Sequence, residues 1–130
     1  MDSLLRRHEY GFLELVDPPS EDELIEYYAH KYYQSEQSNY RKSYPSEELA
    51  AIHLRIELRA AHADSIRASS TPGRMLDVGC GEGFVLATYA ARGWSVEGVD
   101  HSLTGVQTMN PDQAQHVTQG NLFSLLEDRV

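Results

Sequence analysis

Cysteine is nearly absent from this chain of 130 residues, which has one. A single thiol excludes an intrachain disulfide and a zinc site built on several cysteines. Long apolar runs are missing as well, since no stretch approaches the roughly 18 consecutive apolar residues of a membrane helix. The N-terminus also lacks the apolar segment that follows the charges of a secretory signal. We therefore expect a cytoplasmic protein with no membrane partner.

Basic side chains are scarce. The chain has 11 Lys and Arg against 20 Asp and Glu, which leaves a formal net charge of −9. Neither half of the chain is basic, so the electrostatic footprint of nucleic acid binding is missing. We therefore expect no nucleic acid partner. Hydrophobic residues make up 41% of the chain, which indicates a globular protein with a core of its own.

The first part of the chain is rich in Tyr, Glu and Ala and favours helices. Residues 10–16 favour a short strand, and Ser20 with Glu23 predicts a capping box at the start of a helix over 21–33. A second helix is expected over 47–68. Its apolar stripe is formed by Leu49, Ile52, Ile56, Ala60 and Ala63.

A polar and aromatic segment separates these two helices. It could form a lid over a ligand, and the alternative is a solvated loop whose tyrosines pack on the helices. The candidate lid residues are Tyr32, Tyr33, Tyr40, Arg41 and Lys42.

From residue 74 onward, short apolar runs alternate with helical segments. This order predicts an α/β fold with parallel strands and right-handed crossovers. We expect strands over 74–78, 95–100 and 116–120, and helices over 82–92, 102–109 and 122–127. The expected domains are an N-terminal helical and lid segment over 1–70 and a partial Rossmann-like domain over 71–130.

The stretch MLDVGCGEGF joins the first of these strands to its helix. Gly79, Gly81 and Gly83 allow the backbone to bend and a ligand to approach without meeting a Cβ. The following helix directs free amides toward the same spot. Asp100 ends the next strand 21 residues after Gly79, close to the spacing of roughly 20 residues at which such folds place a ribose-binding acid. The predicted ligand is a nucleoside derivative.

Two acids decide which nucleoside derivative fits best. The dinucleotide pattern G-x-G-x-x-G fails because residue 84 is Phe. Asp77 and Glu82 would also repel a pyrophosphate, at a cost of several kcal/mol in a partly dry cleft. S-adenosylmethionine (SAM) carries an ammonium and a sulfonium instead, and it has a ribose for Asp100. An NAD-binding domain is the less favoured interpretation of the same loop.

The segment LDVGCGEG, followed by VEGVD, resembles the motif I and acidic-loop signature of class I SAM-dependent methyltransferases. The resemblance implies that the first acid and the glycines hold the methionine end of SAM. It also implies that Asp100 holds the ribose and that His101 packs on the adenine. Asn121 stands where the family commonly has an acid for the adenine amino group. The cofactor-binding residues so implied are Asp77, Gly79, Cys80, Gly81, Gly83, Asp100, His101, Asn121 and Leu122.

The resemblance also carries expectations about the architecture. Family members have a seven-stranded sheet in the order 3-2-1-4-5-7-6, and this chain stops after the third strand. We expect a partial sheet in the order 3-2-1 with the N-terminal helices packed on it, as a truncated portion of a longer enzyme. Its first strand would form an open edge that can pair with a second copy. Cys80, between two glycines, is interpreted as a small turn residue rather than a reactive thiol.

For function, the resemblance implies a methyltransferase with SAM as cofactor. The stretch DPPSEDELIEYYAHKYYQ resembles the lead-in of small-molecule or sugar methyltransferases, so the expected acceptor is a small molecule. No catalytic base and no metal ligand are assigned. The alternative is a non-catalytic module that keeps the fold and binds a partner protein.

Overall fold

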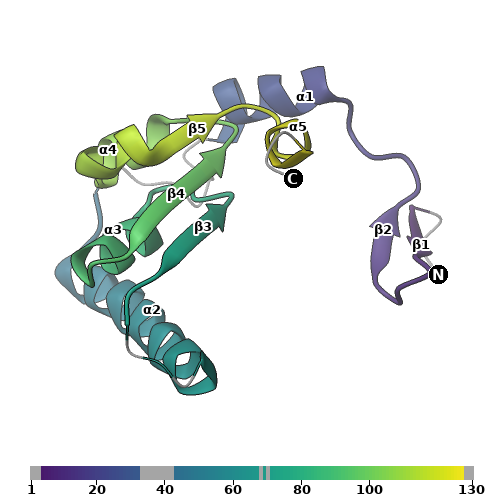
Figure 1. The fold of residues 1–130 in the computed structure, drawn as a ribbon. Coiled ribbons are helices and arrows are strands. Elements are labelled where there is room, and N and C mark those ends of the chain that lie inside the picture. Colours follow the sequence, from purple (N-terminus) through teal and green to yellow (C-terminus); the bar gives the residue numbers. More distant parts are fainter. Residues whose placement is uncertain (1–3, 33–42, 68, 70, 128–130) are drawn as a thin grey trace.

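The computed structural model describes residues 4–32, 43–67, 69 and 71–127. Figure 1 shows the order of the elements along the chain. They are β1 (Leu5–Arg7), β2 (Leu13–Leu15), α1 (Glu21–Glu26), the π-helix η1 (Tyr27–Tyr32), α2 (Ser46–Arg67), β3 (Arg74–Val78), α3 (Phe84–Ala91), β4 (Ser95–Asp100), α4 (Thr104–Met109), the 3-10 helix η2 (Pro111–His116), β5 (Val117–Gln119) and α5 (Leu122–Glu127).

A parallel sheet with the strand order β3-β4-β5 forms the centre of the molecule. Arg74 pairs with Ser95 at one end of β3 and Val78 pairs with Val99 at the other, while β5 pairs with the second half of β4. The connections run through α3 and through α4 with η2, as parallel strands require. The expected α/β fold class and the strand order 3-2-1 are confirmed.

The core lies between the sheet and α3. Cys80, Leu86 and Val96 form its buried cluster. Gly98 on the central strand allows this close packing, because a Cβ there would lie 2.8 Å from Cys80 Sγ and 2.9 Å from Leu86 Cδ1. The thiol therefore fills the core beneath the glycine loop.

The opposite face of β3 is open. Leu76 and Val78 are 41% and 50% exposed, although their strand neighbours Met75 and Asp77 are partly buried. β3 is also an edge of the parallel sheet within the described residues.

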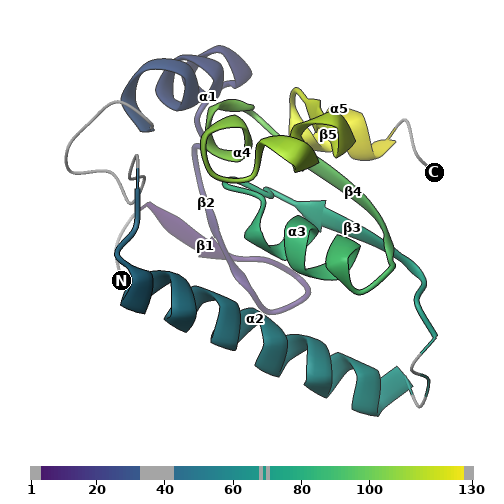
Figure 2. The ribbon, with the colours of Figure 1, turned by 90° about the vertical axis from the view of Figure 1, so that its left-hand side faces the viewer.

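The long helix α2 covers α3 on its outer side (Figure 2). The predicted apolar stripe faces inward, with Ile56 and Ala60 buried. Arg92, just after α3, joins the two helices: its Nη2 lies 2.6 Å from Asp64 Oδ2 and its Nη1 lies 3.8 Å from Glu57 Oε2. Among the described residues, no helix is long and apolar enough to cross a membrane.

The N-terminal β1–β2 hairpin is a feature that the sequence analysis missed. The strand expected over 10–16 is only three residues long, because His8 and Gly11 close the hairpin turn with Gly11 at a φ of 90°. An ion pair between Arg6 and Glu14 links the two strands. The hairpin stands apart from the sheet in Figure 1.

The helix expected over 21–33 is α-helical only as far as Glu26. Its predicted capping box is present, since the Glu23 amide donates to Ser20 Oγ and the Ser20 amide donates to Glu23 Oε2. The chain then continues as the wider π-helix η1.

We expect Arg92→Ala to lower the free energy of unfolding by about 1–3 kcal/mol, because it leaves the partly buried carboxylate of Asp64 with only the longer contact to Arg67, at 3.8 Å. The matched control is Arg74→Ala, whose pair with Glu97 is 3.7 Å long and whose side chain is 85% exposed. The control should change stability by less than about 0.5 kcal/mol in urea denaturation. Equal losses in the two variants would show that the α2–α3 ion pairs add nothing.

Candidate functional site

The glycine loop follows β3 at the carboxyl edge of the sheet, where open α/β sheets bind ligands. Gly79, Gly81 and Gly83 have φ angles of 73°, 52° and 76°, which only glycine adopts without strain. A Cβ on Gly79 or Gly81 would meet nothing within 4 Å, so the outer surface of the loop is free for a ligand. α3 begins at Phe84, two residues later than the expected 82, because Gly83 is left-handed.

α4 packs against the glycine loop. A Cβ on Gly83 would lie 2.8 Å from Val106 Cγ2, and one on Gly105 would lie 2.8 Å from the carbonyl oxygen of Gly81. The Asn110 side chain donates to the carbonyl oxygen of Glu82 at 2.7 Å. The loop is therefore held in place by packing and by a hydrogen bond before any ligand binds.

Asp100, the predicted ribose-binding acid, is buried at the end of β4. Its Oδ2 accepts from the Gly81 amide at 2.8 Å and its Oδ1 accepts from the Ser102 amide at 3.0 Å. Each carboxylate oxygen keeps a second lone pair for another donor. The structure thus brings Asp100 directly against the glycine loop, and its contact with a ribose stays a prediction.

Asp77 is the second acid at this edge and is partly buried at the end of β3. Burial raises the pKa of its carboxyl, and the nearby charge of Asp100 raises it further. Burial and the same two acids raise the pKa of Cys80 to about 12, so its thiol is protonated at neutral pH. The site concentrates negative charge and would be stabilised by a cation.

Glu82 in the loop has a partner that the sequence analysis did not identify. The hydroxyl of Tyr44, just before α2, donates to both carboxylate oxygens of Glu82 at 2.7 and 2.9 Å. Burial raises the pKa of Glu82 while this hydrogen bond opposes the rise. The ring of Tyr44 also contacts Phe84 edge-on. The candidate lid residues Tyr33, Tyr40, Arg41 and Lys42, and the side chain of Tyr32, lie outside the described residues.

His101 follows Asp100 and is covered by an aromatic ring. Tyr28 of η1 stacks on it with ring centroids 5.0 Å apart and an interplanar angle of 8°. The Nδ1 of His101 is buried and has no hydrogen-bond partner among the described residues. Tyr28 therefore brings the N-terminal segment to the edge where adenine binding was predicted, and no sequence spacing indicated this contact.

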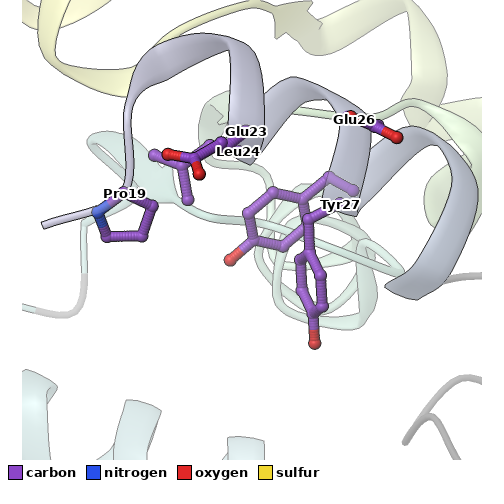
Figure 3. A pocket seen from close by; sticks show the side chains of 6 residues that line it. Pro19, Glu23, Leu24, Glu26 and Tyr27 are labelled. Atoms are coloured by element: carbon purple, nitrogen blue, oxygen red, sulfur yellow. The ribbon is translucent and has the colours of Figure 1, made fainter.

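Tyr28 also lines a hollow of about 480 Å³ along α1 (Figure 3). In the close-up, Tyr27 faces the hollow and the carboxylate of Glu26 points away from it. Among the described residues, the hollow is lined by Pro19, Glu23, Leu24, Glu26, Tyr27 and Tyr28, none of which is basic. It suits an uncharged or cationic group better than an anion.

Asn121 and Leu122 lie at the start of α5. The side-chain oxygen of Asn121 accepts from the amides of Phe123 and Ser124 at 2.9 and 3.1 Å, so it caps the helix. The group that remains for a ligand is its NH₂ donor, whereas the predicted contact used its oxygen. Among the described residues, no three His, Cys, Asp or Glu side chains gather in a way that could hold a metal ion.

This geometry agrees with the comparison to known protein families. The model of a methyltransferase domain matches residues 52–122, which is more than half of the chain. The chain belongs to the methyltransferase domain family. The resemblance to class I SAM-dependent methyltransferases that the loop indicated is thereby confirmed, together with the Rossmann-like fold.

One similar curated protein is the ribosomal RNA small subunit methyltransferase C of Alcanivorax borkumensis. It is 38% identical over 64 residues, which cover 45% of this chain. The match spans only 20% of that relative's length.

This relative corrects one prediction. The exclusion of nucleic acid, which was based on the net charge of −9, is wrong, because a similar methyltransferase is named for ribosomal RNA. Net charge averages over the whole surface, whereas phosphate recognition depends on where individual cations lie. The net charge of this chain therefore does not exclude a nucleic acid partner.

We expect Asp77→Asn to stabilise the ligand-free chain at pH 7. The raised pKa of Asp77 means that the folded state binds this proton more tightly than the unfolded state does. Protonation of Asp77 therefore stabilises the folded state fully at a pH below 3.8, the ordinary pKa of an aspartate. This stabilisation is lost as the pH rises through the raised pKa of the folded state. The stability of Asp77→Asn relative to the original chain should increase between these two pKa values and stay constant at higher pH.

Thermal unfolding between pH 3 and pH 8 measures this effect. The control is Asp17→Asn at an exposed position, which should shift the midpoint by less than about 1–2 °C at any pH. A gain for Asp77→Asn that is the same at every pH would contradict the electrostatic explanation.

Proposed function

We propose that this chain forms the cofactor-binding part of a SAM-dependent methyltransferase. The observation that supports it best is the pair of acids at the open glycine loop, Asp77 and Asp100. Burial and mutual repulsion raise the pKa of Asp77 in the ligand-free chain. A ligand that offers an ammonium to Asp77 and ribose hydroxyls to Asp100 would relieve both effects. SAM has both groups, and an NAD pyrophosphate has the wrong charge.

The proposed contacts follow the positions of the described residues. The Asp77 carboxylate would accept from the ammonium, and the backbone from Gly79 to Gly83, including Cys80, would lie along the methionine end. Asp100 would accept from the ribose hydroxyls with the lone pairs that Gly81 and Ser102 leave unused. The Cys80 thiol takes no part in binding, since it points into the core.

The adenine would lie at the far edge of the site. His101 with Tyr28 would provide the aromatic surface, and Leu122 an apolar one. Because the oxygen of Asn121 caps α5, we assign its NH₂ group to a ring nitrogen of the adenine and not to the amino group.

SAM supplies a methyl group that its sulfonium already activates. The chain's own residues would position this methyl for a nucleophile and exclude water, which is the main source of rate in such a transfer. None of the described residues is assigned as a catalytic base.

Two classes of acceptor have support. The N-terminal stretch resembles small-molecule methyltransferases, which favours a small acceptor. The name of the Alcanivorax relative favours ribosomal RNA. Methyl transfer assays with radiolabelled SAM, run in parallel on a ribosomal RNA substrate and on a sugar panel, separate the two classes.

The deciding experiment is calorimetric titration of the chain with S-adenosylhomocysteine, which lacks the methyl but retains the ammonium and the ribose. We expect saturable binding, and a loss of about 10- to 100-fold in affinity in Asp77→Asn, because a charged hydrogen bond is removed. The matched control is Glu97→Gln, which removes one carboxylate from the middle of the sheet, where Glu97 pairs with Leu76, outside the proposed contacts. It should bind within about twofold of the original chain.

NAD serves as the ligand control. Tighter binding of NAD than of S-adenosylhomocysteine would overturn the proposal in favour of a dinucleotide domain. A folded chain that binds neither nucleoside would support the non-catalytic module instead.

A further inference from the structure

A second hollow, of about 340 Å³, lies between α2 and the glycine loop. Arg55 and Arg59 line it from one side of α2, and Glu82 and Phe84 line it from the loop and α3. The two arginines are four residues apart, so their side chains leave the same face of the helix. The hollow thus presents two cations beside the proposed cofactor site.

These two arginines differ from most other arginines of the described chain. Arg7 likewise has no ion pair, but its Nη1 donates to the carbonyl oxygen of Gly11 at 2.8 Å. Arg6, Arg67, Arg74 and Arg92 each have a carboxylate within 4 Å. None of the ion pairs between described residues includes Arg55 or Arg59. In a chain with 20 acidic side chains, two neighbouring unpaired guanidinium groups are an exception that needs a reason.

The nearest acid in the hollow does not supply the missing partner. Glu82 accepts from the Tyr44 hydroxyl, and among the described residues it forms no ion pair with Arg55 or Arg59. The guanidinium groups of Arg55 and Arg59 therefore stay available to a ligand. A planar guanidinium group can donate two parallel hydrogen bonds to the oxygens of one phosphate.

We propose that this hollow is a phosphate-binding subsite for the methyl acceptor, with Arg55 and Arg59 as its ligands. The inference rests on the proposed methyltransferase function, because the hollow adjoins the loop that would hold SAM. The described residues that line the hollow along α1 include no basic side chain. The phosphate would belong either to an RNA backbone or to a small phosphorylated acceptor.

The test uses two probes on the full chain saturated with S-adenosylhomocysteine. Anisotropy follows binding of a fluorescent single-stranded RNA of 12 nucleotides at several KCl concentrations. NMR of the arginine side chains follows titration with inorganic phosphate. The variant is Arg55→Ala with Arg59→Ala. The control is Arg6→Ala with Arg74→Ala, which makes the same change in net charge away from the hollow.

We expect the Arg55 and Arg59 signals to shift with phosphate. The Arg55/Arg59 double variant should bind RNA at least about tenfold more weakly, with a salt slope smaller by about 1.4, since each phosphate contact on a single strand contributes roughly 0.7. The control should stay within about twofold. RNA binding far tighter than phosphate binding identifies RNA as the source, and phosphate binding alone identifies a small acceptor. Equal effects in the two double variants, or no response to either probe, would overturn the subsite.

Titration of every variant with S-adenosylhomocysteine separates this inference from the proposed function. The Arg55/Arg59 double variant should keep the cofactor affinity, because neither arginine is among the residues proposed to hold the cofactor. Cofactor binding without any anion response rejects the subsite alone. An anion response without cofactor binding rejects the methyltransferase site and keeps a phosphate site on α2.

Discussion

The hydrogen bonds of the Asp100 carboxylate are the constraint on which the site depends. One oxygen holds the Gly81 amide of the loop and the other holds the Ser102 amide that leads into α4. The Asp100 carbonyl also accepts from Gly120 after β5. One buried residue therefore connects the loop, the end of the central strand and the two connections that follow. A ribose would add to an anchor that already exists, so the loop need not reorganise on binding.

Much of the parallel sheet could be predicted from sequence because its signals are local. The bounds of β3 and β4 agree with the expected ranges, since short apolar runs ending in Asp77–Gly79 and Asp100 are visible without any tertiary information. The capping box at Ser20 and the inward stripe of α2 follow from spacings of three and four residues. Each of these features is decided within one or two turns of chain.

The contacts that complete the site could not be predicted in this way. Tyr28 meets His101 across 73 residues and Tyr44 meets Glu82 across 38, and neither pair leaves a periodic trace in the sequence. The helix-capping hydrogen bonds of Asn121 were missed for a related reason. Its oxygen is used by the first amides of α5, and only the position of that helix reveals it. Local chemistry thus identified the loop, while long-range packing decided which side chains surround it.

Charge shows the same division between average and local properties. The acidic composition is an average over the whole surface. At the glycine loop, Asp77 and Asp100 lie close together, so this part of the site disfavours phosphate and favours a cationic ligand. On α2, Arg55 and Arg59 form no ion pair with the described residues, and Glu82 accepts from Tyr44 instead. A methyl transfer to a phosphorylated acceptor needs this separation of charge: a cationic methyl donor and an anionic acceptor must bind side by side without exchanging sites. A uniformly basic surface would attract the anionic acceptor but would repel the cationic donor. The net negative charge of the chain is therefore compatible with an anionic acceptor, because Arg55 and Arg59 lie next to the acids of the glycine loop.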